Sequence, residues 1–88
     1  MIMNWRSNEE SPFSRLGVVV SRRVGGSVVR ARTRRLLREA FRRIQPRMGR
    51  SLDMVLVARK YISGASQNAV DADLSRLLAR IKCLETVV

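Results

Sequence analysis

The sequence predicts an α+β fold, an α/β sandwich in which a small sheet carries a β-α-β crossover through a basic helix and a second helix follows. Two short runs rich in β-branched residues, Leu16–Ser21 and Met54–Ala58, are typical of buried strands. A segment with helical periodicity, Val28–Ile44, lies between them, and another runs from Gln67 to about Leu84. Because a helix joins the two strands, we expect them to lie parallel in one sheet.

The remaining segments complete this outline. The apolar start, Met1–Trp5, predicts a further strand, and the Ser, Asn and Pro residues of Arg6–Arg15 predict a turn or loop. Ser27 is expected to cap the first helix and Pro46 to stop it, while residues 61–66 form a loop before the last helix. No repeat or linker divides the 88 residues, so we expect one domain over residues 1–88.

Positive charge is concentrated in one segment of the chain. The formal net charge is +11, and eleven arginines against the single Glu39 give the segment Arg22–Arg50 a charge of +10. Arginine outnumbers lysine by sixteen to two. Guanidinium groups are planar forks that grip phosphate with two hydrogen bonds, which ammonium groups do not do. A field of one sign on one segment therefore favours a polyanionic partner.

The first predicted helix has an apolar face and an arginine face. At 100° per residue, the apolar face is formed by Val29, Thr33, Leu36, Leu37, Ala40 and Ile44, with Phe41 at its edge. Arginines occupy the other side: Arg35, Arg38 and Arg42 opposite the apolar face, Arg34 close by, and Arg30 and Arg32 at its flanks. Glu39 is placed to pair with Arg35 or Arg43 at four-residue spacing.

A nucleic acid is a better explanation of this face than solvation alone. Surfaces that serve only solubility mix both signs, and arginines three and four residues apart repel one another unless phosphates offset them. The predicted elements do not supply the second packed helix of a helix-turn-helix, and no Asn or Gln is present on the arginine face to read bases. Recognition of backbone and shape, as with folded RNA, is the remaining mode.

Several other functions are disfavoured. The chain has no histidine and no paired carboxylates on one predicted element, so no catalytic residues are predicted, and the single Cys83 supports neither a disulfide nor a cysteine-based zinc site. No apolar run approaches the ~20 residues of a membrane span, and no signal peptide is recognisable, so we expect a cytoplasmic location without membrane contact. The Val24–Ser27 segment is either a tight turn or a phosphate cradle.

The stretch SRLGVVVSRRVGGSVVRARTRRLLREAFRR closely resembles the signature of the bacterial ribonuclease P protein component. That family has a strand ending in Ser and two basic residues, a Val/Ile-Gly turn, an Arg-Asn-Arg triplet, and a basic-basic-Leu-x-Arg-Glu run followed by an aromatic residue. The matching positions here are Ser21, Arg22, Arg23, Val24, Gly25, Arg30, Arg32, Arg34, Arg35, Leu36, Arg38, Glu39 and Phe41. The match is looser from there to about Lys82.

This sequence departs from the family pattern at three places. Ala31 occupies the central position of the triplet, so an amide contact made there by the family's Asn is absent. Gly26 occupies a position where Asn is common. The chain is also expected to begin at the family's second strand, without the leading basic helix and first strand.

The resemblance implies a ribosomal protein S5 domain 2-like fold with a left-handed crossover. It also implies the non-catalytic subunit of an endoribonuclease: the protein binds ribonuclease P RNA, and that RNA uses Mg²⁺ to cleave the 5′ leader from precursor tRNA. The protein itself would bind no cofactor or metal, and a cleft between sheet and helix would hold the leader. The predicted RNA-binding residues are Arg22, Arg23, Arg30, Arg32, Arg34, Arg35, Arg38 and Arg42. The alternative is a ribosomal protein or general RNA chaperone, since the same charge chemistry suits either.

Overall fold

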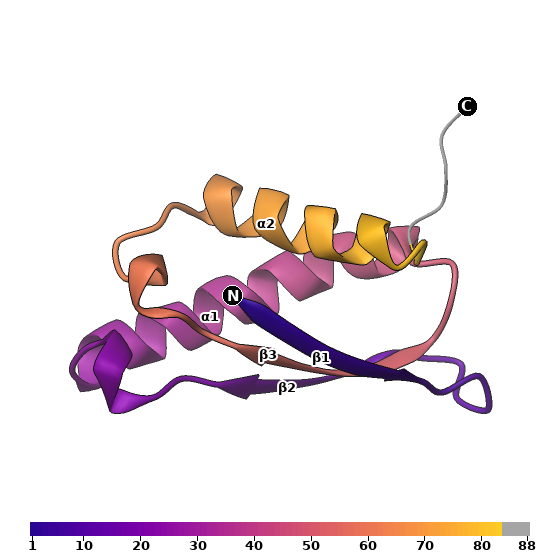
Figure 1. Cartoon of the computed structure of the whole chain (residues 1–88), viewed down its shortest axis with the longest axis horizontal. Helices are drawn as coiled ribbons and strands as arrows, with labels where there is room; N and C mark the ends of the chain where they lie inside the picture. The colour runs from indigo at the N-terminus through magenta and orange to yellow at the C-terminus, as the bar shows by residue number, and fades with distance from the viewer. Residues whose placement is uncertain (84–88) are drawn as a thin grey trace.

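The computed structural model describes residues 1–83 (Figure 1). Over that range, the chain forms three strands, two α-helices and three single 3₁₀ turns. In chain order, the strands and α-helices are β1 (Ile2–Ser7), β2 (Arg15–Val19), α1 (Ser27–Ile44), β3 (Leu52–Val57) and α2 (Gln67–Arg80). The 3₁₀ turns follow β2, α1 and β3, at Arg22–Val24, Gln45–Arg47 and Lys60–Ile62.

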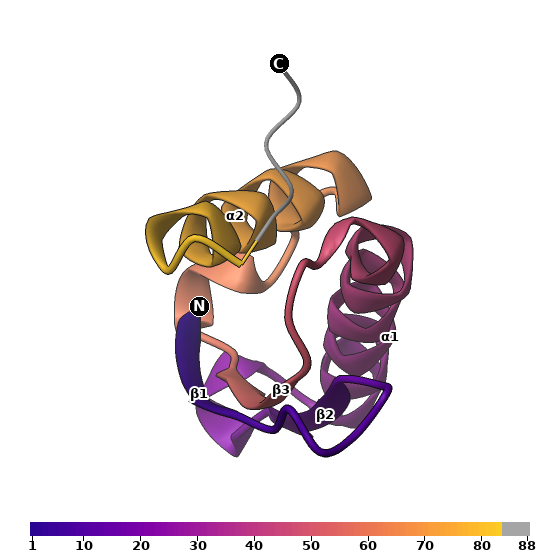
Figure 2. The ribbon, with the colours of Figure 1, turned by 90° about the vertical axis from the view of Figure 1, so that its right-hand side faces the viewer.

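The strands form one mixed sheet in the order β1-β3-β2. β1 runs antiparallel to β3, whereas β2 runs parallel to β3, so the predicted parallel pair is confirmed. Both helices cover the same face of the sheet and leave the other face open (Figures 1 and 2). The expected α/β sandwich is therefore present, and α1 is the crossover between the two parallel strands.

The crossover from β2 through α1 to β3 is left-handed. With the helices toward the viewer and the parallel strands pointing upward, β3 lies to the left of β2 (Figures 1 and 2). Nearly all such connections are right-handed, because that hand suits the natural twist of strands. The left hand agrees with the resemblance and contradicts the general rule.

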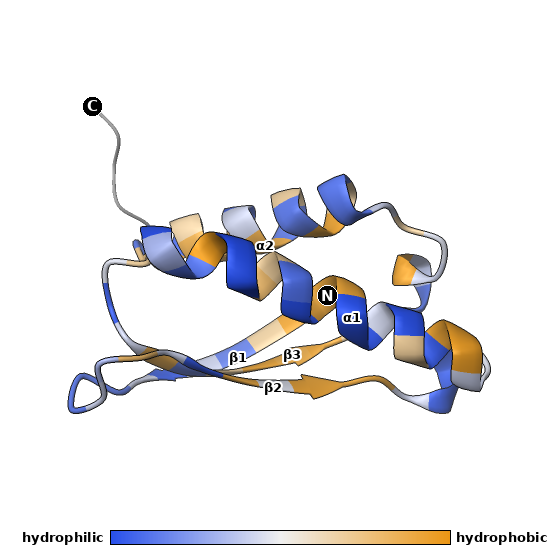
Figure 3. Ribbon diagram, turned by 180° about the vertical axis from the view of Figure 1, so that it is seen from behind, coloured by the Kyte–Doolittle hydropathy of each residue, from blue (hydrophilic) through white to orange (hydrophobic). Residues whose placement is uncertain are grey.

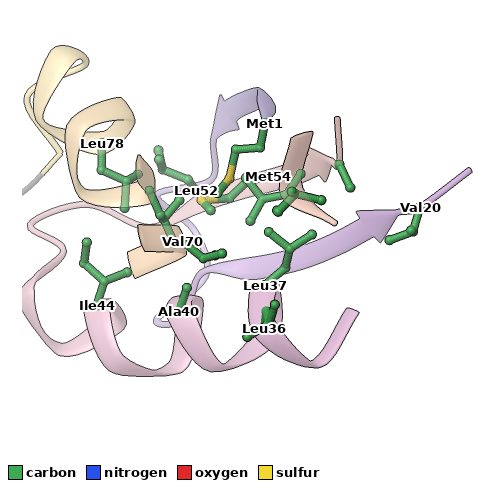
Figure 4. Packing of buried hydrophobic residues seen from close by; sticks show 14 of the residues in the cluster. Met1, Val20, Leu36, Leu37, Ala40, Ile44, Leu52, Met54, Val70 and Leu78 are labelled. Carbon is green, nitrogen blue, oxygen red and sulfur yellow. The ribbon is translucent and has the colours of Figure 1, made fainter. Parts of the chain in front are cut away.

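The core lies between the sheet and the two helices (Figure 4). β3 alternates along its length, with Leu52, Met54 and Leu56 buried against the helices. Helix α1 presents the apolar face that its spacing predicts: Thr33, Leu36, Leu37, Ala40 and Ile44 are buried, and Val29 and Phe41 are partly buried against them. Val70, Leu74 and Leu78 supply the contribution of α2.

The start of α1 and the end of α2 differ from the prediction. Ser27 is the first residue of α1 and not its cap. The cap is Gly26, whose carbonyl accepts the first helical hydrogen bond from the Arg30 N–H at 2.9 Å. Helix α1 ends at Ile44 as expected, and Pro46 lies in the 3₁₀ turn that follows.

Helix α2 ends at Arg80, four residues before the predicted end. Lys82 adopts a left-handed backbone conformation with φ of 56°. The Lys82 N–H donates to the Ala79 carbonyl and the Cys83 N–H to the Leu78 carbonyl, each at 3.0 Å, which is the Schellman arrangement that closes a helix. Leu84 and Glu85, which the sequence placed in this helix, lie outside the described residues.

Gly25 joins the 3₁₀ turn to α1 where a side chain has no room. A Cβ at this position would lie 2.8 Å from Val29 Cγ1, and the φ of 155° is unfavourable for other residues. We expect Gly25→Ala to lower the free energy of unfolding by about 1–3 kcal/mol, as overpacked substitutions do. Chemical denaturation measures this change. Gly26→Ala is the control, because its Cβ would meet nothing within 4 Å, and an equal loss in both variants would contradict this explanation.

An acidic residue on the open face of the sheet joins all three strands. Asp53 of β3 accepts hydrogen bonds from Arg15 on β2 at 2.7 and 2.8 Å, from Arg6 on β1 at 3.2 Å, and from Asn8 at 3.0 Å. These donors, Arg15 foremost, hold the pKa of the Asp53 carboxyl well below its ordinary value. The depressed pKa means that the ionised form contributes to stability.

We expect this contribution to disappear in acid. The carboxyl titrates near pH ~3.9 in the unfolded chain and lower in the folded one, so its stabilisation is complete above pH ~4 and falls as the pH drops toward the folded-state pKa. Asp53→Asn should therefore be less stable than the unmodified protein at pH 7, and the difference should shrink below pH ~4. Urea denaturation at a series of pH values measures it. A difference that stays constant down to pH ~2 would contradict the assigned ion pairs.

Candidate nucleic-acid interface

The arginines opposite the apolar face of α1, among them Arg35 and Arg38, lie on the side of the helix turned away from the core. Hydrophilic residues recur along the solvent side of this helix (Figure 3). Arg35 and Arg38 are exposed and Arg34 is half-buried. Within residues 1–83 none of the three forms an ion pair with a carboxylate. Their guanidinium groups are thus available to an external anion, and the like charges on adjacent turns remain uncompensated inside the protein.

Acidic partners are concentrated at the carboxyl-terminal half of α1. Glu39 pairs with Arg42 at 2.8 Å and lies 4.0 Å from Arg43, which also pairs with Asp71 of α2 at 3.0 Å. The predicted pairing of Glu39 with Arg43 is therefore confirmed. No pairing with Arg35 is present among the described residues, because Arg42, one turn further on, provides two hydrogen bonds. The Arg42 guanidinium holds the pKa of the Glu39 carboxyl below its ordinary value.

Arg30 and Arg32, predicted at the flanks of the apolar face, are both half-buried. The Arg30 Nε is buried and has no hydrogen-bond partner among residues 1–83. The Arg32 Nη2 donates to the backbone carbonyl of Ala65 at 2.9 Å, so this side chain is directed at the loop that precedes α2. The eight predicted arginines therefore do not share one environment. Arg42 is paired with a carboxylate, Arg32 is bonded to a backbone carbonyl, and Arg30 has a buried Nε without a partner among residues 1–83. The other five have no carboxylate partner in that range.

A second group of basic residues lies at the amino-terminal end of α1. Arg22 and Arg23 are exposed in the 3₁₀ turn after β2, and this turn contacts the one after β3. Arg59 and Lys60 are exposed at the end of β3, beside that contact. These two residues are not among the arginines predicted from the sequence to bind RNA. The signal was available, because the carboxyl ends of two parallel strands meet at the same edge of a sheet.

The open face of the sheet has a shallow groove of about 520 Å³. Its lining includes the paired residues Gly17 of β2 and Val55 of β3 and the Arg6–Asp53–Arg15 cluster. The space between the sheet and the two helices is filled by the core, so the groove lies on the opposite side of the sheet. The predicted cleft between sheet and helix is therefore not open over its core-filled part, and leader binding stays a prediction.

The exposed arginines of this arrangement are suited to binding an anion. Residues 1–83 contain no cluster of three or more His, Cys, Asp or Glu side chains with the geometry of a metal site. In the same range neither helix has the length and apolar character needed to cross a bilayer. Exposed guanidinium groups on one rigid helix can contact successive phosphates of a polyanion, with hydrogen bonds that charge makes stronger. Fold and surface together define a small, arginine-rich α+β sandwich with a basic crossover helix.

Comparison with known proteins identifies its family. The model of the family Ribonuclease P matches residues 1–82. The ribonuclease P protein component of Alkaliphilus oremlandii is 33% identical over 76 residues, which cover 86% of this chain and 67% of that protein. The protein component of Gluconacetobacter diazotrophicus is 37% identical over 83 residues, which cover 91% and 70%. The chain belongs to the ribonuclease P protein family, and it spans between about half and two thirds of the length of several relatives.

Solved structures agree with this assignment. The RNase P protein from Thermotoga maritima superposes with a TM-score of 0.77 at 33% identity, covering 89% of this chain and 74% of that one. The Staphylococcus aureus RNase P protein gives a TM-score of 0.79 at 24% identity, which supports the fold alone. The resemblance drawn from the sequence is confirmed, and so is the fold class that it implied.

Proposed function

We propose that this chain is the protein subunit of ribonuclease P and binds the RNA subunit through the arginine face of α1. In this proposal the RNA carries the chemistry and uses Mg²⁺ to remove the 5′ leader of precursor tRNA in the cytoplasm. The observation that carries it is the set of guanidinium groups at Arg34, Arg35 and Arg38, which have no carboxylate partner among residues 1–83 and occupy the helix that bears the family signature.

The physical role of the protein is to supply fixed positive charge where RNA strands approach one another. Each guanidinium–phosphate contact releases counterions, so the affinity gains a term that does not depend on base identity. Because α1 is packed on the sheet through Leu36, Leu37 and Ala40, the arginines are held on a rigid scaffold and lose little freedom on binding. The positive field of the helix is extended past its amino-terminal end by four exposed basic residues, Arg22, Arg23, Arg59 and Lys60.

Reconstitution tests the function. The full chain is added to a bacterial ribonuclease P RNA and precursor tRNA at a Mg²⁺ concentration where the RNA alone cleaves slowly. We expect faster release of the 5′ leader with the unmodified protein and little acceleration with Arg34→Ala/Arg38→Ala. Absence of acceleration would contradict the proposal. Tighter binding to ribosomal RNA than to ribonuclease P RNA, measured in the same buffer, would favour a ribosomal protein or RNA chaperone instead.

Glu39 should limit how strongly the carboxyl-terminal half of α1 binds RNA. Phosphate must compete with this carboxylate for Arg42, and an exposed ion pair is weak enough to be displaced at a modest cost. We expect Glu39→Gln to raise RNA affinity about two- to fivefold, since Arg42 then needs no displacement. Fluorescence anisotropy with labelled ribonuclease P RNA measures this.

The matched control removes the same charge elsewhere. Glu10 is exposed in the β1–β2 loop and has no ion-pair partner among residues 1–83. Glu10→Gln should change the affinity less than Glu39→Gln. Equal gains in the two variants would show that net charge alone acts, and the pairing of Glu39 with Arg42 would then have no specific role.

A further inference from the structure

Arg32 differs from the other arginines of α1 in the direction of its side chain. Its Nη2 donates to the Ala65 carbonyl at 2.9 Å, and the residue is half-buried. Arg35 and Arg38 are exposed and have no such bond. Guanidinium groups keep their charge when they donate to a carbonyl, but the fork is then oriented by the protein backbone. The contact therefore fixes a geometry between α1 and the loop that contains Ala65.

That loop, residues 58–66, has a defined internal structure. The Ser63 N–H donates to the Lys60 carbonyl at 3.2 Å and the Ala65 N–H donates to the Ile62 carbonyl at 3.0 Å. Ile62 is buried with 2% of its surface exposed, and Gly64 has a φ of 85° that turns the chain. The loop is thus a folded unit. Backbone hydrogen bonds join Ala65 to Ile62 and Ser63 to Lys60, so a contact that holds Ala65 also restrains the position of Lys60.

A second hydrogen bond ties the same region to α1. Just after the loop, the Gln67 Nε2 donates to the Leu36 carbonyl at 3.0 Å. Arg32 and Leu36 are one helical turn apart, so the two bonds reach neighbouring turns of α1. In one bond α1 donates through the Arg32 side chain, and in the other α1 accepts through the Leu36 carbonyl. Together they hold the loop beside the helix.

The loop carries two exposed basic residues, and the side chains of Arg32 and Gln67 supply hydrogen bonds that join its end to α1. Arg59 and Lys60 are exposed, and the 3₁₀ turn Lys60–Ile62 contacts the turn Arg22–Val24. Loss of the Arg32 bond would leave the Gln67 bond, the burial of Ile62 and the contact between the two 3₁₀ turns to hold the loop, and would allow this basic group more movement relative to the arginine face. A loosely held charge must lose conformational freedom when a ligand binds, which lowers affinity.

We propose that Arg32 is a positioning residue: it holds the loop bearing Arg59 and Lys60 beside α1, and it acts on RNA through that loop and not as a phosphate ligand. The effect on RNA rests on the proposed function, whereas the effect on the loop does not. The consequence is that the two outer arginines of the family triplet, Arg30 and Arg32, are not equivalent.

Amide hydrogen exchange of the free protein tests whether Arg32 holds the loop beside α1. The Ser63 and Ala65 amides, which are bonded within the loop, should exchange roughly 2–10-fold faster in Arg32→Gln than in the unmodified protein, the effect expected from one lost hydrogen bond. Arg35→Gln is the control and should leave both amides unchanged. Unchanged exchange in Arg32→Gln would overturn the proposal.

A double-mutant cycle tests whether Arg32 acts on RNA through Arg59 and Lys60. Arg32→Gln should weaken binding of ribonuclease P RNA in the unmodified background, and should add less than about a twofold loss in the background Arg59→Gln/Lys60→Gln. Arg35→Gln should weaken binding by the same factor in both backgrounds. A full effect of Arg32→Gln in the loop-substituted background would show a direct phosphate contact and overturn the proposal. Failure of the proposed function is seen separately, as RNA binding that Arg34→Ala/Arg38→Ala leaves intact.

Discussion

Arg34→Ala/Arg38→Ala should bind ribonuclease P RNA about 100-fold more weakly than the unmodified protein at near-physiological salt. The estimate follows from two charge-assisted contacts at the lower end of their usual strength. The slope of log affinity against log salt should also decrease in magnitude by about 1.4 to 1.8, because two phosphates are no longer neutralised. Titrations by filter binding or anisotropy at four or five salt concentrations give both numbers.

The fold should not suffer from this double substitution. Alanine is a better helix former than arginine, and the change removes a repelling pair at four-residue spacing on an outward face. A control of equal charge exists on the other helix, where Arg76 and Arg80 are exposed at the same spacing and Arg76 pairs with Asp73 at 2.9 Å. Arg76→Ala/Arg80→Ala removes the same net charge. If it weakens binding as much as the α1 variant, the interface is not on α1.

The sequence predicts most of the fold because burial follows the period of each element. The three- and four-residue spacing along α1 identifies a single face to bury, and the structure buries that face. The apolar run Met54–Ala58 identifies a buried strand but not which of its faces is buried, and the structure buries alternate residues of β3 against the helices. A parallel pair follows once a helix joins two strands. The hand of the crossover does not follow from patterning, since either hand places the same apolar faces against each other. It became an expectation only through the family resemblance.

The helix ends were mispredicted for local reasons. At the start of α1 two glycines and a serine are adjacent, and the choice of cap depends on a backbone carbonyl that any of them could supply. At the end of α2 the apolar period continues to Leu84, and no Gly or Pro marks the stop. The helix ends because Lys82 takes a left-handed conformation, for which lysine gives no advance signal.

The candidate site, too, is predicted from the sequence only in part. Which arginines face outward follows from the helix period alone. Which of them are already engaged does not, because spacing offers Glu39 three arginines and cannot show that Asp71 of α2 also contacts Arg43. The bond from Arg32 to Ala65 joins residues 33 positions apart, so only the packing of the loop on α1 shows it. Tertiary contacts thus decide how a face of like charges is divided.

Leu37→Ala should destabilise the protein more than any surface substitution. Leu37 is fully buried, with 0% of its surface exposed, where α1 faces the sheet and α2 (Figure 4). Truncation of such a leucine removes its transfer energy and leaves a cavity, so we expect a loss of about 2–5 kcal/mol in the free energy of unfolding. In a domain of this size that corresponds to a fall of roughly 10 °C or more in Tm, which differential scanning calorimetry measures.

Val28→Ala is the control for this prediction, because Val28 lies on the same helix with 82% of its surface exposed and should change stability by less than about 0.5 kcal/mol. Leu37→Ala should lower stability without loss of phosphate contacts, whereas Arg34→Ala/Arg38→Ala should lower RNA affinity without loss of stability. At a temperature where Leu37→Ala is still folded, its salt slope for RNA should equal that of the unmodified protein, since every phosphate contact is intact. A reduced slope would mean that Leu37 shapes the arginine face itself, and that the interface and the core are not energetically independent.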